Sequence, residues 1–417
     1  MRSKSDKKKP LVPSLRFPEF REAGAWEVKR LGGIGSVSMC KRILKSQTSE
    51  SGDIPFYKIG TFSKQADAFI ENKIYEEFKE KYSFPNKGDI LISASGTIGR
   101  TVVYDGKPAY FQDSNIVWIA NNENILLNAF LYYCYKTIQW QTDDNTISRL
   151  YNDNLRKMKI VVPPIPEQQK IAHCLSSLDE VIGLQAKKVQ TLKRHKKGLM
   201  QQLFPAEGET TTPRLRFPEF REAGAWEVRR LGEIGKISKG KGISKSDIKP
   251  NGALPCIRYG ELYTHYGEVI RDVVSFTDAN PGNLVLSEEN DVIIPASGET
   301  KEDIATASCV SVKGVALGGD LNIFYSLMNG MFLAYYIRGN LKFEISKVAQ
   351  GNSVVHLYTT QLEKLKLAVP PYPKEQQKIA HCLSSLDEVI GLESHKLDAL
   401  KNLKKGLMQQ LFPQEVA

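Results

Sequence analysis

The sequence predicts an α+β protein built as a pseudo-two-fold internal repeat, in which two α+β domains are joined by two long helices that form an antiparallel coiled coil. Three observations predict it. Two blocks of sequence each occur twice. Both copies of the second block begin a long stretch with the heptad pattern of a helix, and the segments between the blocks alternate strand and helix patterns. Each half therefore consists of a constant block, a diverged segment and a second constant block.

The length and charge of the chain limit the classes of protein to consider. A chain of 417 residues is too long for one ordinary core, so two or more domains are expected. The formal charge of +10 favours an anionic partner such as nucleic acid. The charged opening MRSKSDKKKP is unlike a signal peptide, and the sequence has no apolar run of about 18 residues. We expect a cytoplasmic protein with no membrane contact.

The two copies of the first repeated block are almost identical. Residues 15–35 and 215–235 differ only at Lys29/Arg229 and Gly33/Glu233. The second block, EQQKIAHCLSSLDEVIGL, occurs at 167–184 and 375–392, and the likeness resumes at KKGLMQQLFP. The resulting domains are a basic disordered tail at 1–14, a first domain at 15–162 (repeated segment 15–35), a helix at 163–205, a linker at 206–214, a second domain at 215–369 (repeated segment 215–235) and a C-terminal helix at 370–413.

Each predicted long helix carries a heptad seam. Apolar residues step by alternating four and three positions, and both seams are interrupted at the same two places, by Gln185 and Lys196 in one copy and Glu393 and Lys404 in the other. A rod of about 54 Å must bury its seam, and the economical partner is the other copy. Antiparallel overlap would bring Gln185 near Glu393. The seam residues are Ile171, Leu175, Leu178, Ile182, Val189, Leu192, Leu199, Leu203, Ile379, Leu383, Leu386, Ile390, Leu397, Leu400, Leu407 and Leu411.

The diverged segments indicate mixed structure. Apolar, β-branched runs predict strands, and longer amphipathic runs predict helices. The predicted strands are DILISAS, DVIIPAS, TVVY and NIVWIA, and the predicted helices are FLYYCYKTIQW and MFLAYYIRGNLKF.

The motifs that would support catalysis are missing. The glycine loop SASGTIGR at 93–100 lacks the Lys-Ser/Thr of a P-loop and precedes a strand, which favours a hairpin turn over a phosphate site. VPPI at 162–165 and VPPY at 369–372 lack the acceptor side chain that an amino-methyltransferase motif places before its Pro pair, so the prolines are interpreted as strand-to-helix connectors. No metal ligands or cofactor motif are expected.

Basic loops recur at one place in both halves. CKRILK at 40–45 and KISKGKGISKSDIK at 236–249 both follow the first constant block. Lys and Arg in such loops can neutralise phosphates, and Asn, Gln and Arg can read base edges. A solvated basic loop is the alternative interpretation.

Taken together, LRFPEF, GDILISASGTIG and the doubled EQQKIA helix after a Pro pair make the chain similar to the specificity subunit of type I restriction-modification enzymes, over nearly its whole length. The resemblance implies two target-recognition domains, each reading one half of a bipartite, asymmetric DNA site. It implies that the conserved helices set the spacer and that the conserved regions dock two adenine N6-methyltransferase subunits. Restriction subunits can join such an assembly. S-adenosylmethionine, ATP and Mg²⁺ would sit on those partners, and this chain would be non-catalytic.

The candidate DNA contacts combine the basic loops with polar residues near the predicted turns. They are Lys41, Arg42, Lys45, Ser95, Thr97, Arg100, Gln112, Asn115 and Arg149 in the first half, and Lys239, Lys241, Lys245, Arg258, Lys301, Asn322 and Asn352 in the second. Two alternatives stay open at this point: a self-contained methyltransferase or nuclease, and a coiled-coil scaffold that binds protein and not DNA.

Overall fold

The computed structural model describes residues 11–140, 149–206, 211–351 and 354–413, which divide into two compact units. The first unit contains residues 1–184 and 397–417, and the second contains residues 185–396. Each unit therefore includes the beginning of one long helix and the end of the other. The helices are α4 (Ile165–Leu203) and α11 (Pro373–Leu411), 39 residues each.

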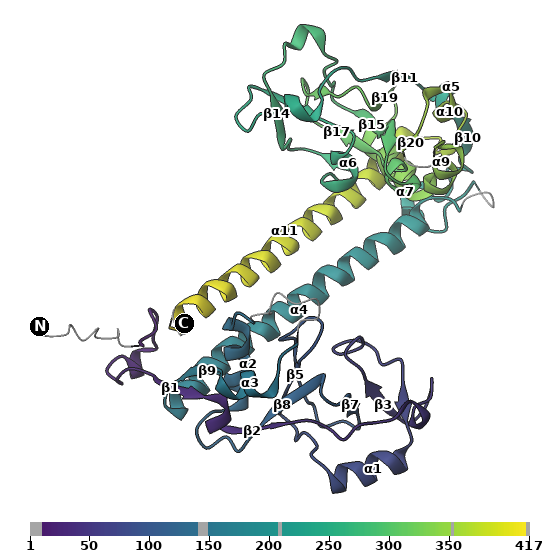
Figure 1. Cartoon of the computed structure of the whole chain (residues 1–417). Coiled ribbons are helices and arrows are strands. Elements are labelled where there is room, and N and C mark those ends of the chain that lie inside the picture. Colours follow the sequence, from purple (N-terminus) through teal and green to yellow (C-terminus); the bar gives the residue numbers. More distant parts are fainter. Residues whose placement is uncertain (1–10, 141–148, 207–210, 352–353, 414–417) are drawn as a thin grey trace, which may run out of the picture. The chain divides into compact units, whose positions relative to one another are not determined.

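The first unit carries a mixed domain at the start of α4 (Figure 1). One sheet has the order β2-β8-β5-β6, a second has β4-β3-β7, and β1 pairs with β9. The bounds are β1 Glu27–Arg30, β2 Gly35–Ser38, β3 Ile54–Tyr57, β4 Phe69–Ile70, α1 Asn72–Lys81, β5 Ile90–Ser93, β6 Thr101–Val103, β7 Tyr110–Phe111, β8 Ile116–Asn121, α2 Asn128–Thr137, α3 Asn152–Lys157 and β9 Lys159–Val162.

The second unit repeats this plan with additions. Its sheets have the orders β11-β19-β15-β17-β13 and β14-β12-β18, and the pairs β10-β21 and β16-β20 complete it. The bounds are β10 Glu227–Arg230, α5 Leu231–Ile234, β11 Gly235–Lys239, β12 Leu254–Ile257, α6 Glu261–Thr264, β13 Val269–Ile270, β14 Ser275–Thr277, β15 Asp291–Pro295, β16 Ser297–Gly298, α7 Lys301–Ile304, β17 Ser308–Val310, β18 Ala316–Leu317, β19 Leu321–Ser326, α8 Gly330–Asn340, α9 Lys342–Val348, β20 Val355–His356, α10 Thr359–Leu362 and β21 Lys366–Val369.

The predicted α+β class is confirmed, and the predicted strands correspond to β5, β15, β6 and β8. SASGTIGR is the hairpin loop between β5 and β6, closed by Ser93 N–H donating to the Arg100 carbonyl at 2.9 Å. One prediction was too simple. MFLAYYIRGNLKF forms two helices, α8 and α9, because the backbone leaves helical geometry at Leu341 (φ −97°, ψ 5°).

The two long helices run antiparallel in the predicted register. Within the second unit, Gln185 Nε2 donates to the Glu393 carboxylate at 2.6 Å and to its carbonyl at 2.8 Å. Lys196 pairs with Asp387 in that unit, and Lys404 pairs with Asp179 in the first. The partner number falls as the α4 number rises, which is the signature of antiparallel pairing.

Burial follows the predicted seam. Every predicted seam residue is buried or partly buried, whereas Leu184 and Leu392, which lie off the seam, are each 69% exposed. The aspartates that pair with the two seam lysines also bind the domains. Asp179, the partner of Lys404, accepts from Tyr133 of α2 at 2.9 Å, and Asp387, the partner of Lys196, accepts from Tyr335 of α8. Each seam lysine is therefore linked through its aspartate to the α+β domain of its unit.

A buried ion pair fixes each first repeated block to a helix start. Arg16 donates from Nε and Nη2 to the two carboxylate oxygens of Glu167 at 2.7 and 2.6 Å. Arg216 does the same with Glu375, at 2.7 Å in both contacts. The Glu167 and Glu375 side chains are at most 1% exposed, so each pair is shielded from water. The hydrogen bond and charge of Glu167 raise the pKa of Arg16.

The helix ends close the cores. Leu411 and Phe412, at the end of α11, pack in the first unit beside Trp26, whose ring meets Phe412 edge to face at 6.3 Å. Leu203 and Phe204, at the end of α4, join Trp226 in the second unit. The repeated LFP and AWE segments therefore contribute equivalent core contacts in the two units.

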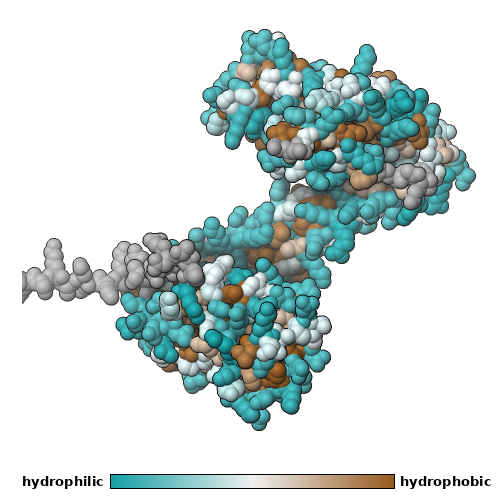
Figure 2. Space-filling model, turned by 45° about the vertical axis from the view of Figure 1, so that its right-hand side comes forward, coloured by the Kyte–Doolittle hydropathy of each residue, from teal (hydrophilic) through white to brown (hydrophobic). Residues whose placement is uncertain are grey.

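The predicted tail and linker are described only in part. Residues 1–10 and 207–210, from the predicted tail and linker, lie outside the described residues. Within the predicted tail, Leu11 accepts from the Trp26 N–H at 2.9 Å, and Ser14 Oγ donates to the Gln410 carbonyl at 3.3 Å. On the face seen in Figure 2, hydrophilic residues cover much of each domain.

Replacing Arg16 with Met should lower the free energy of unfolding of the first unit by about 3 to 5 kcal/mol, because Glu167 would remain buried without a counter-charge. Urea unfolding followed by tryptophan fluorescence measures it. The double variant R16M/E167L should recover most of this stability, since no charge is then left buried. Equal destabilisation by the single and double variants would contradict this account.

Candidate nucleic-acid interface

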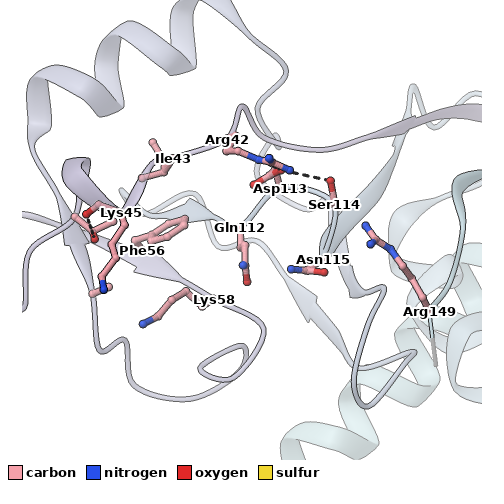
Figure 3. A pocket seen from close by; sticks show the side chains of 12 residues that line it. Arg42, Ile43, Lys45, Phe56, Lys58, Gln112, Asp113, Ser114, Asn115 and Arg149 are labelled. Carbon is pink, nitrogen blue, oxygen red and sulfur yellow. Dashed lines mark hydrogen bonds and ion pairs between the residues drawn. The ribbon is translucent and has the colours of Figure 1, made fainter. Parts of the chain in front are cut away.

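A cavity of about 500 Å³ opens in the first unit, and five of the predicted DNA contacts line it (Figure 3). These five are Arg42, Lys45, Gln112, Asn115 and Arg149. They come from three separate stretches of chain, so the fold brings together side chains that the sequence could only select one at a time. All belong to the diverged segment.

Strand pairing explains why they meet. β3 and β7 are parallel neighbours, with Phe56 beside Tyr110 and Tyr57 beside Phe111. The residues that follow these strands, Lys58 and Gln112, therefore lie at the same sheet edge and both line the cavity. The basic loop after β2 supplies Arg42 and Lys45 to the same cavity.

The turn between β7 and β8 presents the polar groups. Ser114 has a φ of 59°, in the left-handed region, and the Asn115 N–H donates to the Asp113 carbonyl at 2.6 Å. Gln112 Oε1 accepts from the Ile59 N–H at 2.9 Å, which leaves its Nε2 as the outward donor. Asn115 Oδ1 accepts from Ser95 Oγ at 2.9 Å, so Ser95 positions a cavity residue.

The cavity is cationic with one internal carboxylate. Arg42 Nε donates to Asp113 Oδ2 at 2.9 Å, and Lys58 pairs with Asp67. Lys41 lies outside this lining, with its Nζ 4.9 Å from the centre of the Tyr82 ring. Sequence reasoning missed Lys58 and Asp113. Lys58 could have been found because it aligns with Arg258 in the repeat, and Asp113 because it follows Gln112 directly.

Arg100 lies outside the cavity lining, and its guanidinium supports a loop. Nη2 donates to the Ile59 carbonyl at 2.9 Å and Nη1 to the Phe62 carbonyl at 3.3 Å. These bonds fix the segment that follows β3, and that segment includes the Ile59 N–H that holds Gln112. Thr97 is exposed in the β5–β6 loop and is absent from the cavity lining.

In the second unit the candidate residues do not form an equivalent cluster. Lys239, Lys241 and Lys245 are exposed around the end of β11, and Lys301 is exposed on α7. Arg258 is held by Glu261 at 3.0 Å. The predicted DNA contact of Asn322 does not agree with its burial, since Asn322 is 0% exposed and donates to the Leu357 carbonyl. Asn352 lies outside the described residues.

The second unit lacks the polar residues that follow β7 in the first unit. β12 and β18 pair in parallel as β3 and β7 do, with Ile257 beside Leu317, but the residues that follow β18 are Gly318 and Gly319. Glycines bring no polar side chain where the first unit places Gln112 and Asp113. Among the described residues, no cluster of three metal-ligating side chains occurs. No described helix is long and apolar enough to cross a membrane.

A second cavity, of about 640 Å³, lies within the second unit beside β10, β21 and the start of α11. Glu227 and Arg229 of the first repeated block line it, together with Pro370 and Pro371 and the exposed Leu327. Its walls thus include the Pro pair and repeated segments, in contrast to the cavity of the first unit.

The two halves of the chain match one known domain family. The type I restriction modification DNA specificity domain family, Methylase_S, matches residues 24–194 and 224–402. The chain belongs to this family, in two copies. The resemblance inferred from the sequence is confirmed, and the chain is a DNA-recognition component rather than a catalyst of such systems.

Individual relatives agree with this assignment. A Haemophilus influenzae protein described as a putative type I restriction enzyme specificity subunit is 60% identical over 154 residues, a match that spans 37% of this chain and 40% of that relative. The type I restriction enzyme MjaVIII specificity subunit of Methanocaldococcus jannaschii is 25% identical over 95% of this chain and 93% of its own length. The fold is similar to that of the type I restriction-modification system S subunit from M. genitalium (TM-score 0.67, 16% identity, 97% of this chain and 100% of that chain).

Replacing Arg100 with Ala should destabilise the first unit by about 1 to 3 kcal/mol, because two carbonyls lose their donor. Hydrogen exchange should show weaker protection around residues 59–62. Unchanged stability combined with weakened DNA binding would instead restore Arg100 as a contact.

Proposed function

We propose that this chain is the specificity subunit that reads a bipartite, asymmetric DNA site in the cytoplasm, with one half-site assigned to each recognition domain. The observation that carries the proposal is the gathering of Arg42, Lys45, Gln112 and Asn115 around one cavity of the diverged segment. Guanidinium, ammonium and amide groups are the side chains that contact phosphates and base edges. The second domain offers the exposed lysines Lys239, Lys241 and Lys245 of its basic loop in place of that cavity.

The repeated blocks support docking of one modification subunit to each half. Arg21 and Glu22 are exposed, and their copies Arg221 and Glu222 are exposed as well. Core packing does not require exposed side chains to be identical, whereas binding the same partner twice does. We assign these surfaces to two adenine methyltransferase subunits, and restriction subunits would join through that assembly.

The continuous helices support a spacer role. α4 begins in the first unit and ends in the second, while α11 runs the other way. A polar pair in the seam, Gln185 with Glu393, opposes sliding because a shifted register would bury these groups unpaired. Fixed register means a fixed length of helix between the recognition domains.

DNA binding should fall steeply with salt, since phosphate contacts release counterions. The triple variant K239Q/K241Q/K245Q should flatten the slope of log K against log salt by about 0.9 for each phosphate that is no longer neutralised. Titrations of the chain assembled with its modification subunit on duplex DNA measure the slope. The matched control is K342Q/K347Q/K364Q, at exposed lysines of the same unit. Equal slopes for the two triples, or methyl transfer by the purified chain alone, would contradict the proposal.

Inserting about four residues into each helix, after Leu184 and at the facing position beside Glu393, should lengthen the preferred spacer. Four residues add about 6 Å, or about two base pairs of 3.4 Å. Mapping methylated adenines across a genome reads the half-sites and spacer together. A control that exchanges Val181 and Leu184 for Ala, without insertion, should leave the spacer unchanged. Altered half-sites with an unchanged spacer would refute the spacer role.

A further inference from the structure

The pairing of Arg42 with Asp113 leaves one edge of the arginine exposed. The guanidinium uses Nε to bond Asp113 Oδ2 at 2.9 Å, and its two Nη groups have no partner among the described residues. The Arg42 side chain is 68% exposed, so this edge is accessible. Figure 3 shows Arg42 and Asp113 side by side on the cavity wall, with Gln112 and Asn115 next to them.

Asp113 is itself held in place. Its side chain is 16% exposed, and Ser114 Oγ donates to Oδ2 at 3.3 Å. The left-handed backbone at Ser114 and the Asn115 N–H bond to the Asp113 carbonyl fix the turn that carries it. Arg42 is therefore oriented before a ligand arrives, which reduces the entropy cost of binding.

The Asp113 carboxylate favours a base edge over a phosphate as the ligand of Arg42. A phosphate beside Arg42 would also lie close to the Asp113 charge, and like charges repel. A guanine-cytosine pair carries the opposite pattern in the major groove, with acceptors O6 and N7 on guanine and the N4 amine donor on cytosine. The exposed Nη edge matches the acceptors. Asp113 Oδ1 has no partner among the described residues and matches the amine.

We propose that Arg42 reads a guanine of the first half-site in the major groove and that Asp113 is its positioning residue. This inference rests on the proposed function and deepens it. Gln112, whose Oε1 is occupied by Ile59, presents Nε2 as a further donor toward the neighbouring base. The second unit cannot do the same. The position of Arg42 is taken there by Gly242, and that of Asp113 by Gly319.

The test selects DNA from a randomised duplex pool with the chain assembled with its modification subunit. The wild type should require guanine at one position of the half-site that depends on the first domain. R42A should lower the preference for that guanine by about 5- to 150-fold, the range for one bidentate contact, while the other half-site keeps its preference. R42K, which keeps the charge without the fork, should also lose the preference.

Base analogues then identify the atom. Replacing the selected guanine with 7-deazaguanine removes N7 and should weaken wild-type binding, but it should leave R42A binding unchanged. Inosine, which keeps O6 and N7, is the matched control and should bind the wild type like guanine. D113N should weaken the guanine preference less than R42A, because the arginine remains but is less firmly oriented.

The possible outcomes distinguish the guanine assignment from the function on which it rests. No sequence preference in the wild type would end the proposed function itself. A wild-type preference that R42A and R42K leave intact would overturn only the guanine assignment. Uniform weakening of all sequences by R42A, with a flatter salt slope, would also overturn it, because that is the behaviour of a phosphate contact. Equal urea midpoints for wild type, R42A and R42K exclude misfolding as the cause.

Discussion

The buried bidentate pairs Arg16–Glu167 and Arg216–Glu375 are the constraint on which the rest of the structure depends. Two charges removed from water tolerate neither the removal of a partner nor a shift in geometry. Each pair therefore fixes the first repeated block against the start of a long helix. The helix end from the other copy then completes the same core, through Phe412 beside Trp26 in one unit and Phe204 near Trp226 in the other.

This arrangement accounts for the division of the chain into constant and diverged segments. The residues that form the ion pairs, most of the seam and the contacts of Trp26 and Trp226 with the helix ends lie in the repeated blocks, where a change in one residue requires a matching change in its partner. The residues at the strand ends around the first cavity are not constrained by these framework contacts. Arg42, Gln112 and Asp113 in one unit correspond to glycines in the other, while the surrounding strand pairing is retained. Specificity can thus change without disturbing the framework.

Polar groups in the seam illustrate how stability is balanced against register. Gln185 and Glu393 replace apolar residues at the middle of the coiled coil and hydrogen-bond to each other. Lys196 and Lys404 replace them nearer the ends, and each reaches an aspartate that also accepts from a tyrosine of the recognition domain. These contacts tie domain, helix and partner helix together. An all-leucine seam would pack well in several registers and would not specify one.

The sequence by itself determined the internal repeat, the α+β class, the antiparallel seam with Gln185 facing Glu393, and the family, because periodicity and repetition are properties of the letters alone. It also selected five residues of the first cavity. Only the tertiary structure separated these from Arg100 and Asn322, since hydrogen bonding to a distant carbonyl and complete burial depend on which strands become neighbours. The Arg42–Asp113 pair was equally out of reach, because its partners are 71 positions apart and meet through the sheet.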